Sequence, residues 1–241
     1  MTHIVSIRNL TKAFGTHEVI RNCTISVNEG EIYGFLGANG AGKTTVLKLI
    51  AGLLNPTSGR IEVCGMEHPG NREAILRNIG SLIEVPAFYE HLSATENLEI
   101  HLAYMGIQKA DIEGTLNRVG LPGTSAQPVS QFSLGMRQRL GIARTIIHKP
   151  RLLLLDEPIN GLDPMGIRDM RELFSSLAHE DGMTLMISSH ILGEIEHIAN
   201  TVGVIVDGAV VKEVAMDSIK KNYPEGLEDY FFTVMRGREA Q

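Results

Sequence analysis

Apolar and polar residues alternate along two stretches near the start of the chain, residues 3–9 and 18–28. Such alternation is typical of half-buried strands, and Gly15 lies between the two stretches at a position suited to a turn. The pattern therefore predicts two antiparallel strands at the amino-terminal end. A further strand, bounded by glycines, is predicted over 59–65.

The middle of the chain, from about residue 90 to 150, changes to helical spacing. Apolar residues there recur at intervals of three and four, as they do on the buried face of an amphipathic helix. The last helix of this segment is predicted over 135–148, with Pro150 ending it. Strands are predicted on both sides of the segment, at 79–83 before it and at 152–155 after it.

The strand at 152–155 consists of four leucines, which favours a strand buried on both faces in the centre of a parallel sheet. Strands and helices continue to alternate around it, with a tight turn at Asp207-Gly208. Helices are predicted at 71–78, 165–179 and 190–198, and strands at 183–188, 202–206 and 209–214. The alternation predicts an α/β protein, in which residues 222–241 show the least regular pattern, although their aromatic residues indicate some packing.

One glycine-rich stretch matches the phosphate-binding pattern G-x-x-x-x-G-K-[ST] without a gap or a substitution. A buried strand over 31–36 precedes it and a helix over 46–52 follows it, which is the setting that the motif requires. Glycines let backbone N–H groups point inward at phosphate oxygens, and the helix amino terminus adds partial positive charge. The stretch and the residue after it are Gly37, Ala38, Asn39, Gly40, Ala41, Gly42, Lys43, Thr44 and Thr45. Lys43 is expected to reach the β- and γ-phosphates, and Thr44 to bind Mg²⁺.

Two acidic residues, Asp156 and Glu157, directly follow the leucine run. Nucleotide hydrolysis needs a carboxylate for the metal and a group that polarises the attacking water. Because side-chain direction alternates at a strand end, Asp156 is expected to face the Mg²⁺ and Glu157 the water. An acidic strand end without such a role is the alternative, which would require coincidence with the phosphate loop.

Charge and cysteine content narrow the setting in which the protein works. A formal net charge of −6 over 241 residues argues against a general nucleic-acid-binding protein. Cys23 and Cys64 form no metal-binding pattern and are interpreted as free thiols in a reducing compartment, with a disulfide as the lesser alternative. The start of the chain lacks signal-peptide features, and no apolar run reaches the roughly 20 residues that cross a bilayer. A cytoplasmic protein without direct membrane insertion is expected.

Three further segments resemble the ATPase subunits of ATP-binding cassette transporters, and the resemblance covers roughly residues 3–235. The first resembles the family's LSGGQ signature, the second its D-loop, and the third the segment that carries its switch histidine. They are Phe132-Ser133-Leu134-Gly135-Met136-Arg137-Gln138-Arg139, Ile159-Asn160-Gly161-Leu162-Asp163, and Ser188-Ser189-His190. The signature departs from the family pattern at Phe132, Leu134 and Met136.

The resemblance implies a P-loop NTPase fold with a mixed core sheet, an antiparallel β subdomain and an inserted α-helical subdomain. It implies one nucleotide-binding domain over 1–241, with the helical subdomain at about 88–150 and a C-terminal extension at 215–241. It also implies a homodimer, formed head to tail when ATP binds, in which two ATP molecules are sandwiched between the subunits.

Several site residues are implied by this resemblance. Ser133 and Gly135 would meet the γ-phosphate held by the opposite subunit, and Asp163 belongs to the loop that crosses the interface. His190 would contact the γ-phosphate, making Lys43, Glu157 and His190 the expected catalytic residues, and Phe14 would stack on adenine. Other roles remain open: Ser133 could be a plain helix cap, His190 a surface group, and Phe14 a core residue.

Glu84 stands where most of these ATPases carry a glutamine. A carboxylate can bind Mg²⁺, so Thr44, Asp156 and Glu84 form the expected metal set, although sequence drift in a solvated loop is the alternative. The segment Leu82 to Tyr89, which contains this glutamate, resembles the corresponding segment in the ATPases of lantibiotic-immunity and bacitracin-resistance exporters. Phe88 and Tyr89 could contact a membrane subunit or pack in the core.

The sequence thus predicts an ATP- and Mg²⁺-dependent ATPase that powers a separate membrane permease. The resemblance implies export of a lantibiotic or related peptide antibiotic, with the ATPase held peripherally at the inner face of the cell membrane by the permease. The alternative is a soluble ATPase of the same superfamily that acts on nucleic acid or ribosomes. Such relatives carry a long coiled coil or two cassettes in one chain, and the sequence shows neither.

Overall fold

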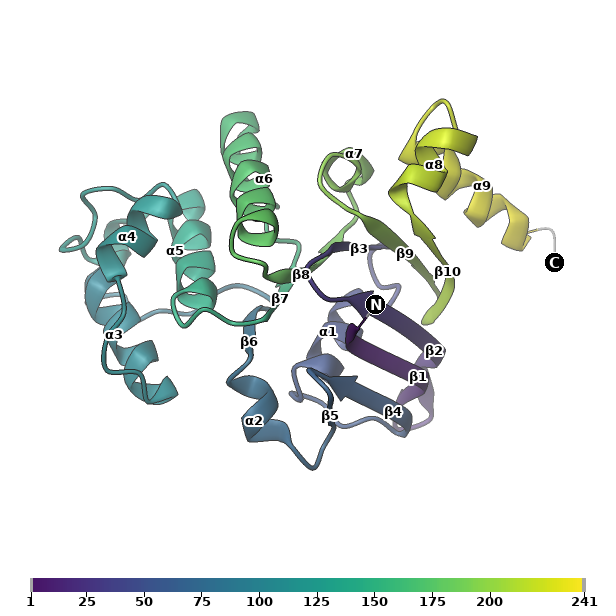
Figure 1. Ribbon diagram of the computed structural model, residues 1–241, viewed down its shortest axis with the longest axis horizontal. Helices are drawn as coiled ribbons and strands as arrows, with labels where there is room; N and C mark the ends of the chain where they lie inside the picture. The colour runs from purple at the N-terminus through teal and green to yellow at the C-terminus, as the bar shows by residue number, and fades with distance from the viewer. Residues whose placement is uncertain (1, 240–241) are drawn as a thin grey trace.

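A six-stranded sheet with the order β10-β9-β3-β8-β7-β6 forms the centre of the computed structural model, which describes residues 2–239 (Figure 1). Neighbouring strands run parallel except β9 and β10, which pair antiparallel, so the sheet is mixed. The strands are β3 (Ile32–Leu36), β6 (Ile79–Leu82), β7 (Leu152–Asp156), β8 (Thr184–Ser189), β9 (Thr201–Val206) and β10 (Ala209–Ala215). The predicted domain limits include residues 1, 240 and 241, which lie outside the described residues.

A second, four-stranded sheet has the order β2-β1-β4-β5, and its pairs are antiparallel. Its strands are β1 (His3–Phe14), β2 (His17–Asn28), β4 (Ser58–Val63) and β5 (Met66–Glu67). The predicted strands are confirmed, but β1 continues five residues beyond the predicted end at Asn9. Asn9 has a φ of 50°, and the pairing shifts register between Ile7 and Leu10. This bulge interrupts the alternation on which the prediction depended.

Helices cover both faces of the six-stranded sheet and extend beyond its ends (Figure 1). They include α1 (Lys43–Ile50), α2 (Arg72–Leu76), α6 (Pro164–His179), α7 (Leu192–Glu196), α8 (Met216–Asn222) and α9 (Leu227–Glu239). Helix α7 is shorter than the predicted 190–198, because Ile191 at its start has an extended backbone. The C-terminal residues fold into α8 and α9, and Tyr230 is buried there, which confirms the predicted packing of this region.

The chain between β6 and β7 is helical, as predicted, and lies at one end of the molecule (Figure 1). It comprises α3 (Ala94–Met105), α4 (Ile112–Arg118), a 3₁₀ turn (Val129–Gln131) and α5 (Leu134–Ile146). Helix α3 begins with a capping box, in which Ser93 and Glu96 bond each other's backbone N–H groups. Ser133 caps α5 and Asp163 caps α6 in the simpler way, through one side-chain acceptor.

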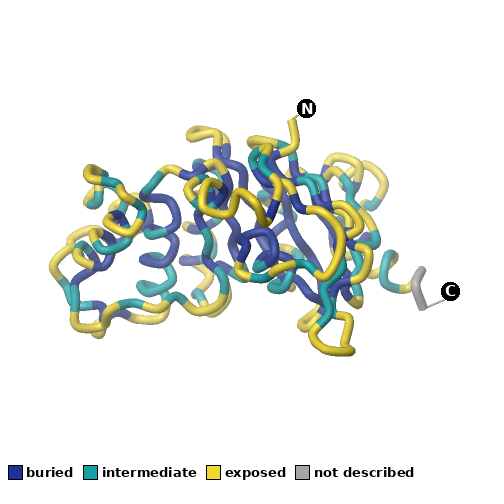
Figure 2. Tube along the Cα trace, turned by 90° about the horizontal axis from the view of Figure 1, so that it is seen from below, coloured by how far each residue is buried: buried dark blue, intermediate teal, exposed yellow. Residues whose placement is uncertain are grey.

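Two hydrophobic clusters pack against opposite faces of the six-stranded sheet, whose strands are among the buried segments in Figure 2. Leu152 and Leu154 belong to the cluster that contains the apolar residues of α1, whereas Leu153 and Leu155 belong to the other. The leucine run is therefore buried on both faces, as predicted. Since side chains alternate along a strand, Asp156 follows Leu152 and Leu154 onto the face that α1 covers.

Candidate nucleotide site

The phosphate-binding loop lies between β3 and α1, as the motif requires. Gly42 caps α1 at a φ of 108°, where a Cβ would meet the Ile20 side chain at 2.6 Å. A Cβ on Gly37 would meet the Ile205 carbonyl oxygen, also at 2.6 Å. Glycine is thus needed at both positions, once for backbone conformation and once for close packing. Residues 38–40 are exposed at the mouth of the loop, where phosphate groups can reach the backbone N–H groups.

The Lys43 side chain folds back over this loop and is only 6% exposed. Its Nζ donates to the carbonyl oxygens of Gly37 and Ala38, at 2.7 and 3.3 Å. The same Nζ lies 3.3 Å from Oε1 of Glu157. The structure therefore brings together two of the three predicted catalytic residues, and the ammonium group is held at the loop where phosphates would bind.

Thr44 and Asp156 meet directly, because α1 packs on the sheet face toward which Asp156 points. The Thr44 hydroxyl donates to Asp156 Oδ2 at 2.6 Å, and the Ser188 hydroxyl donates to Asp156 Oδ1, also at 2.6 Å. Residues 156 and 188 are paired in register between β7 and β8, which explains the second contact. A hydroxyl and a carboxylate form the hard-oxygen donor set that Mg²⁺ prefers, so these residues fit the metal predicted there.

Glu157 and His190 form the third contact of the site. His190 Nδ1 lies 2.8 Å from Oε2 of Glu157, while the other carboxylate oxygen of Glu157 faces Lys43. Glu157 has a φ of 48°, and its N–H donates to Ser188 Oγ at 3.0 Å. The left-handed turn after β7 thus sends Glu157 away from the Asp156 position while a fixed backbone holds it. The arrangement can orient a carboxylate next to the place of the terminal phosphate.

The predicted signature and D-loop segments lie against each other. A Cβ on Gly161 would come 3.3 Å from Leu134 Cδ2, and Gln138 Nε2 donates to the Pro158 carbonyl at 2.8 Å. Ser133 is exposed and caps α5 by accepting the Met136 N–H at 3.3 Å. Asp163 similarly accepts the Gly166 N–H at 2.8 Å. The cap alternative for Ser133 is therefore observed, and its contact with a partner's phosphate stays a prediction.

Glu84 and Phe14 are both exposed. Glu84 forms an ion pair with Lys48 at 2.6 Å, and within residues 2–236 it makes no hydrogen bond with Thr44 or Asp156. Its metal-binding role stays a prediction. Phe14 is 49% exposed, with Lys12 Nζ 4.9 Å from its ring centre. The core alternative for Phe14 is wrong, and an accessible aromatic face remains for the predicted stacking on adenine.

A family model described as ABC transporter matches residues 20–160, more than half of the chain. The chain belongs to this family. An ABC transporter ATP-binding protein of Bacillus subtilis (strain 168), YcbN, is 52% identical over 95% of this chain and 75% of that protein. The predicted resemblance to transporter ATPases is confirmed, and the chain is an ABC-type ATP-binding subunit with the ATPase activity expected of the family.

Two relatives of this ABC subunit have names that state a transported compound. The bacitracin transport ATP-binding protein BcrA of Bacillus licheniformis is 49% identical, over 95% of this chain and 75% of that protein. The lantibiotic transport ATP-binding protein SrtF of Streptococcus pyogenes is 44% identical, over 95% of this chain and 96% of that protein. These are the two kinds of ATPase that the setting of Glu84 resembles.

Solved structures confirm the P-loop ABC ATPase fold. An ATP-binding subunit of an ABC transporter superposes with a TM-score of 0.87 at 26% identity, covering 96% of this chain and 99% of that one. The cassette MJ0796, in a dimeric post-hydrolysis state bound to ADP and Pi, gives a TM-score of 0.79 at 25% identity, covering 88% and 98%. Among the described residues of this ABC subunit, no helix has the length and apolar character needed to span a membrane.

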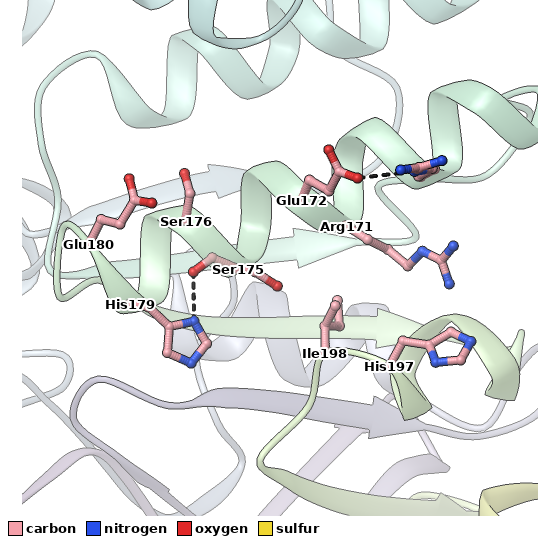
Figure 3. Close-up of a pocket in the computed structure, with 9 residues that line it drawn as sticks. Arg171, Glu172, Ser175, Ser176, His179, Glu180, His197 and Ile198 are labelled. Atoms are coloured by element: carbon pink, nitrogen blue, oxygen red, sulfur yellow. Dashed lines mark hydrogen bonds and ion pairs between the residues drawn. The ribbon is translucent and has the colours of Figure 1, made fainter.

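A pocket of about 590 Å³ lies apart from these residues, between α6 and the end of α7 (Figure 3). Its lining includes Arg171, His179 and His197, and none of the predicted site residues. Arg168 and Glu172 pair with each other across one turn of α6. This pocket therefore belongs to a different surface of the ABC subunit from the phosphate loop.

Sequence reasoning missed two side chains that organise the site, Ser188 and Lys48. Ser188 links Asp156 to the backbone of Glu157, and Lys48 holds Glu84. The position of Ser188 two residues before His190 could have indicated its role. It lies at the end of the predicted strand before His190, and the neighbouring strand ends in Asp156 and Glu157. For Lys48, the signal was its spacing of four residues from Thr44 on one helix face.

Both cysteines are free, as predicted.

Proposed function

We propose that this ABC subunit powers a separate membrane permease that removes a lantibiotic or a bacitracin-like peptide antibiotic from the membrane. The observation that carries the ATP-hydrolysing part of the proposal is the contact network of Lys43, Glu157 and His190 beside Thr44 and Asp156. The names of the bacitracin and lantibiotic relatives support this substrate class. The net charge of −6 gives no support to a nucleic-acid partner.

In the proposed reaction, Lys43 exchanges its carbonyl and carboxylate partners for the β- and γ-phosphates of ATP. Glu157, oriented by His190, then accepts a hydrogen bond from the attacking water and so polarises it. Thr44 and Asp156 would hold Mg²⁺, with Glu84 as a third oxygen donor, and the bound metal would stabilise charge on the phosphates. His190 would also contact the γ-phosphate and so help to position the water.

The proposed working unit is a head-to-tail homodimer with two ATP molecules at its interface. Ser133 is exposed, its neighbour Leu134 is 62% exposed, and Met165 at the start of α6 is 66% exposed. Exposed apolar side chains next to polar donors suit an interface that closes around a ligand. Ser133 and Gly135 would meet the γ-phosphate on the opposite subunit, with Asp163 in the loop between the two sites.

The proposed permease contact lies in the segment 85–91. Val85 is 84% exposed and Tyr89 50% exposed, whereas Phe88 is half-buried with the Arg144 guanidinium 5.0 Å from its ring centre. Val85 and Tyr89 would seat part of the membrane subunit. The helices within about 88–150 form the proposed helical subdomain, 215–241 the proposed extension, and the subunit would sit at the inner face of the cell membrane.

The proposal is tested in the cells from which the chain derives. A tagged chain is purified from detergent-solubilised membranes, and a polytopic membrane protein is expected to accompany it. Disruption of the gene is expected to raise sensitivity to bacitracin or to a lantibiotic, with rescue by the wild type and not by Glu157→Gln. Unchanged sensitivity to both peptide classes would contradict the proposed substrate, and purification without a membrane protein would contradict the proposed partner.

A further inference from the structure

The carboxylate of Glu84 is held by a lysine from the phosphate-loop helix. Lys48 Nζ lies 2.6 Å from Glu84 Oε1, and the two side chains are 28% and 65% exposed. Glu84 has a φ of 65°, a left-handed conformation that is uncommon for a residue with a side chain. We infer that Lys48 is a positioning residue that holds Glu84 beside α1 and competes with a divalent cation for its carboxylate. The inference rests on the metal role proposed above for Glu84.

Lys48 and Thr44 lie on the same face of α1, because they are four residues apart. Four residues of helix rise by roughly 6 Å, which is about one turn. Thr44 donates to Asp156, so Lys48 pairs with Glu84 from a position about one helical turn along α1 from the hydroxyl of the proposed metal set. When a cation binds at that set, the Glu84 carboxylate would exchange Lys48 for the cation.

The strand register places Glu84 and Asp156 at the same end of the sheet, where the strands β6 and β7 finish. Strands β6 and β7 run parallel, with Leu82 paired to Leu155. Asp156 is the next residue after Leu155, and Glu84 is the second after Leu82. Both acids therefore leave the sheet at the same edge, the one where the phosphate loop begins α1. Lys48 pairs with Glu84 from α1, the helix that also carries Thr44 of the proposed metal set.

The rest of the segment 84–90 is anchored to α5 by two arginines. Arg144 donates to the Ala87 carbonyl at 2.9 Å, and both guanidinium nitrogens Nη1 and Nη2 of Arg137 pair with the Glu90 carboxylate. These hydrogen bonds lower the pKa of Glu90 below its usual range. Release of Glu84 would free the end of the segment nearest α1 while the α5 end stays fixed.

When a divalent cation is present, charge decides whether the Glu84 carboxylate binds the cation or Lys48. A divalent cation attracts a carboxylate more strongly than one ammonium group does, and the Lys48 contact is exposed and hence weak. A glutamine at position 84 carries no charge, so Lys48 would have little to compete for. Removing the lysine should therefore help metal binding only when residue 84 is a glutamate.

The test is a double-mutant cycle on ATP binding in a Glu157→Gln background, which prevents turnover. Binding of a fluorescent ATP analogue is titrated with Mg²⁺ alone as the metal. Lys48→Met is expected to lower the half-saturating Mg²⁺ concentration about two- to fivefold, the range for an exposed ion pair. The same substitution is expected to have no effect beside Glu84→Gln, and Lys109→Met, at an exposed lysine elsewhere, is the matched control.

No shift with Lys48→Met, or an equal shift with and without Glu84→Gln, would overturn the inference. A second measurement needs neither nucleotide nor metal: hydrogen exchange at the amides of residues 84–90 is expected to be faster in Lys48→Met than in the wild type. Unchanged exchange would equally overturn it. If the Glu157→Gln protein without any further substitution fails to bind the analogue, the result would instead count against the proposed function. The two failures are therefore distinguishable.

Discussion

The Lys43 ammonium group lies 3.3 Å from Oε1 of Glu157, while His190 holds the second oxygen of the same carboxylate at 2.8 Å. The phosphate-loop lysine is thus paired with the residue proposed to polarise water. Incoming phosphates would draw Lys43 away and leave one oxygen of Glu157 free to accept from water. Under the proposed roles, nucleotide binding would be coupled to exposure of the Glu157 carboxylate through this ion pair.

Lys43→Met tests the phosphate contact of this pair. The loss of a charged hydrogen-bond donor is expected to weaken ATP binding about ten- to hundredfold. Binding is measured by titration with a fluorescent ATP analogue, with Lys212→Met at an exposed position as the control. Wild-type affinity in Lys43→Met would contradict the role given to this lysine.

His190→Ala tests the orientation of Glu157. The substitution removes the 2.8 Å contact to the Glu157 carboxylate while leaving the phosphate loop unchanged. Hydrolysis is expected to fall about a hundredfold or more, with ATP binding altered much less. Steady-state phosphate release and analogue binding measure the two effects, and His197→Ala serves as a control in the pocket of Figure 3. A parallel loss of binding and hydrolysis would argue against an orienting role.

Ser93→Ala tests the capping box at the start of α3. Ser93 Oγ accepts the Glu96 N–H at 3.2 Å, and Glu96 accepts the Ser93 N–H at 2.7 Å. Loss of the cap is expected to lower the free energy of unfolding by about 1 kcal/mol. Urea denaturation measures this change, with the exposed Ser125→Ala as the reference. An unfolding free energy equal to that of the reference would show that the cap contributes nothing.

Stability is expected to fall in mild acid because three histidines resist protonation in the folded state. Burial lowers the pKa of His68 and His148, and burial with the nearby His148 and Arg144 lowers that of His101 to about 4. The unfolded chain binds protons at the ordinary histidine pKa of about 6.5, so acid favours unfolding. For His101, stability is complete above that value and is lost as the pH falls from it toward about 4.

The measurement is the free energy of unfolding between pH 7 and pH 5.5, where few carboxylates titrate. His101→Gln is expected to flatten its decline with acid, whereas His17→Gln, at an exposed position, is expected to leave the slope unchanged. Equal slopes in the wild type and His101→Gln would rule out a contribution from His101.

The sequence predicted those parts of the fold whose signals are local. The leucine run of β7 and the glycines of the phosphate loop carry their structural reasons within a few residues, namely burial on two faces and backbone conformations that exclude side chains. Strand β1 was predicted too short because a bulge at Asn9 changes which residues share a face. Such a bulge is set by pairing with a distant strand, which local alternation does not report.

Contacts within the site depend on pairing between distant segments. Asp156 meets Ser188 because β7 and β8 align in one register, and the Lys48–Glu84 ion pair joins α1 to the segment that follows β6. The motifs indicated which acids to consider, but neither register nor packing could be read from them. The phosphate loop and its acids were therefore predictable as a group, whereas the serine and lysine that hold them were not.

In the proposed mechanism, ATP binding joins two copies of this subunit. The mass of purified Glu157→Gln is measured by light scattering after size-exclusion chromatography, with and without ATP and Mg²⁺. We expect a monomer without ATP and a dimer with it, and a return to monomer when Ser133→Arg is added at the exposed signature position. A Glu157→Gln protein that binds ATP and remains monomeric would rule out dimerisation driven by ATP.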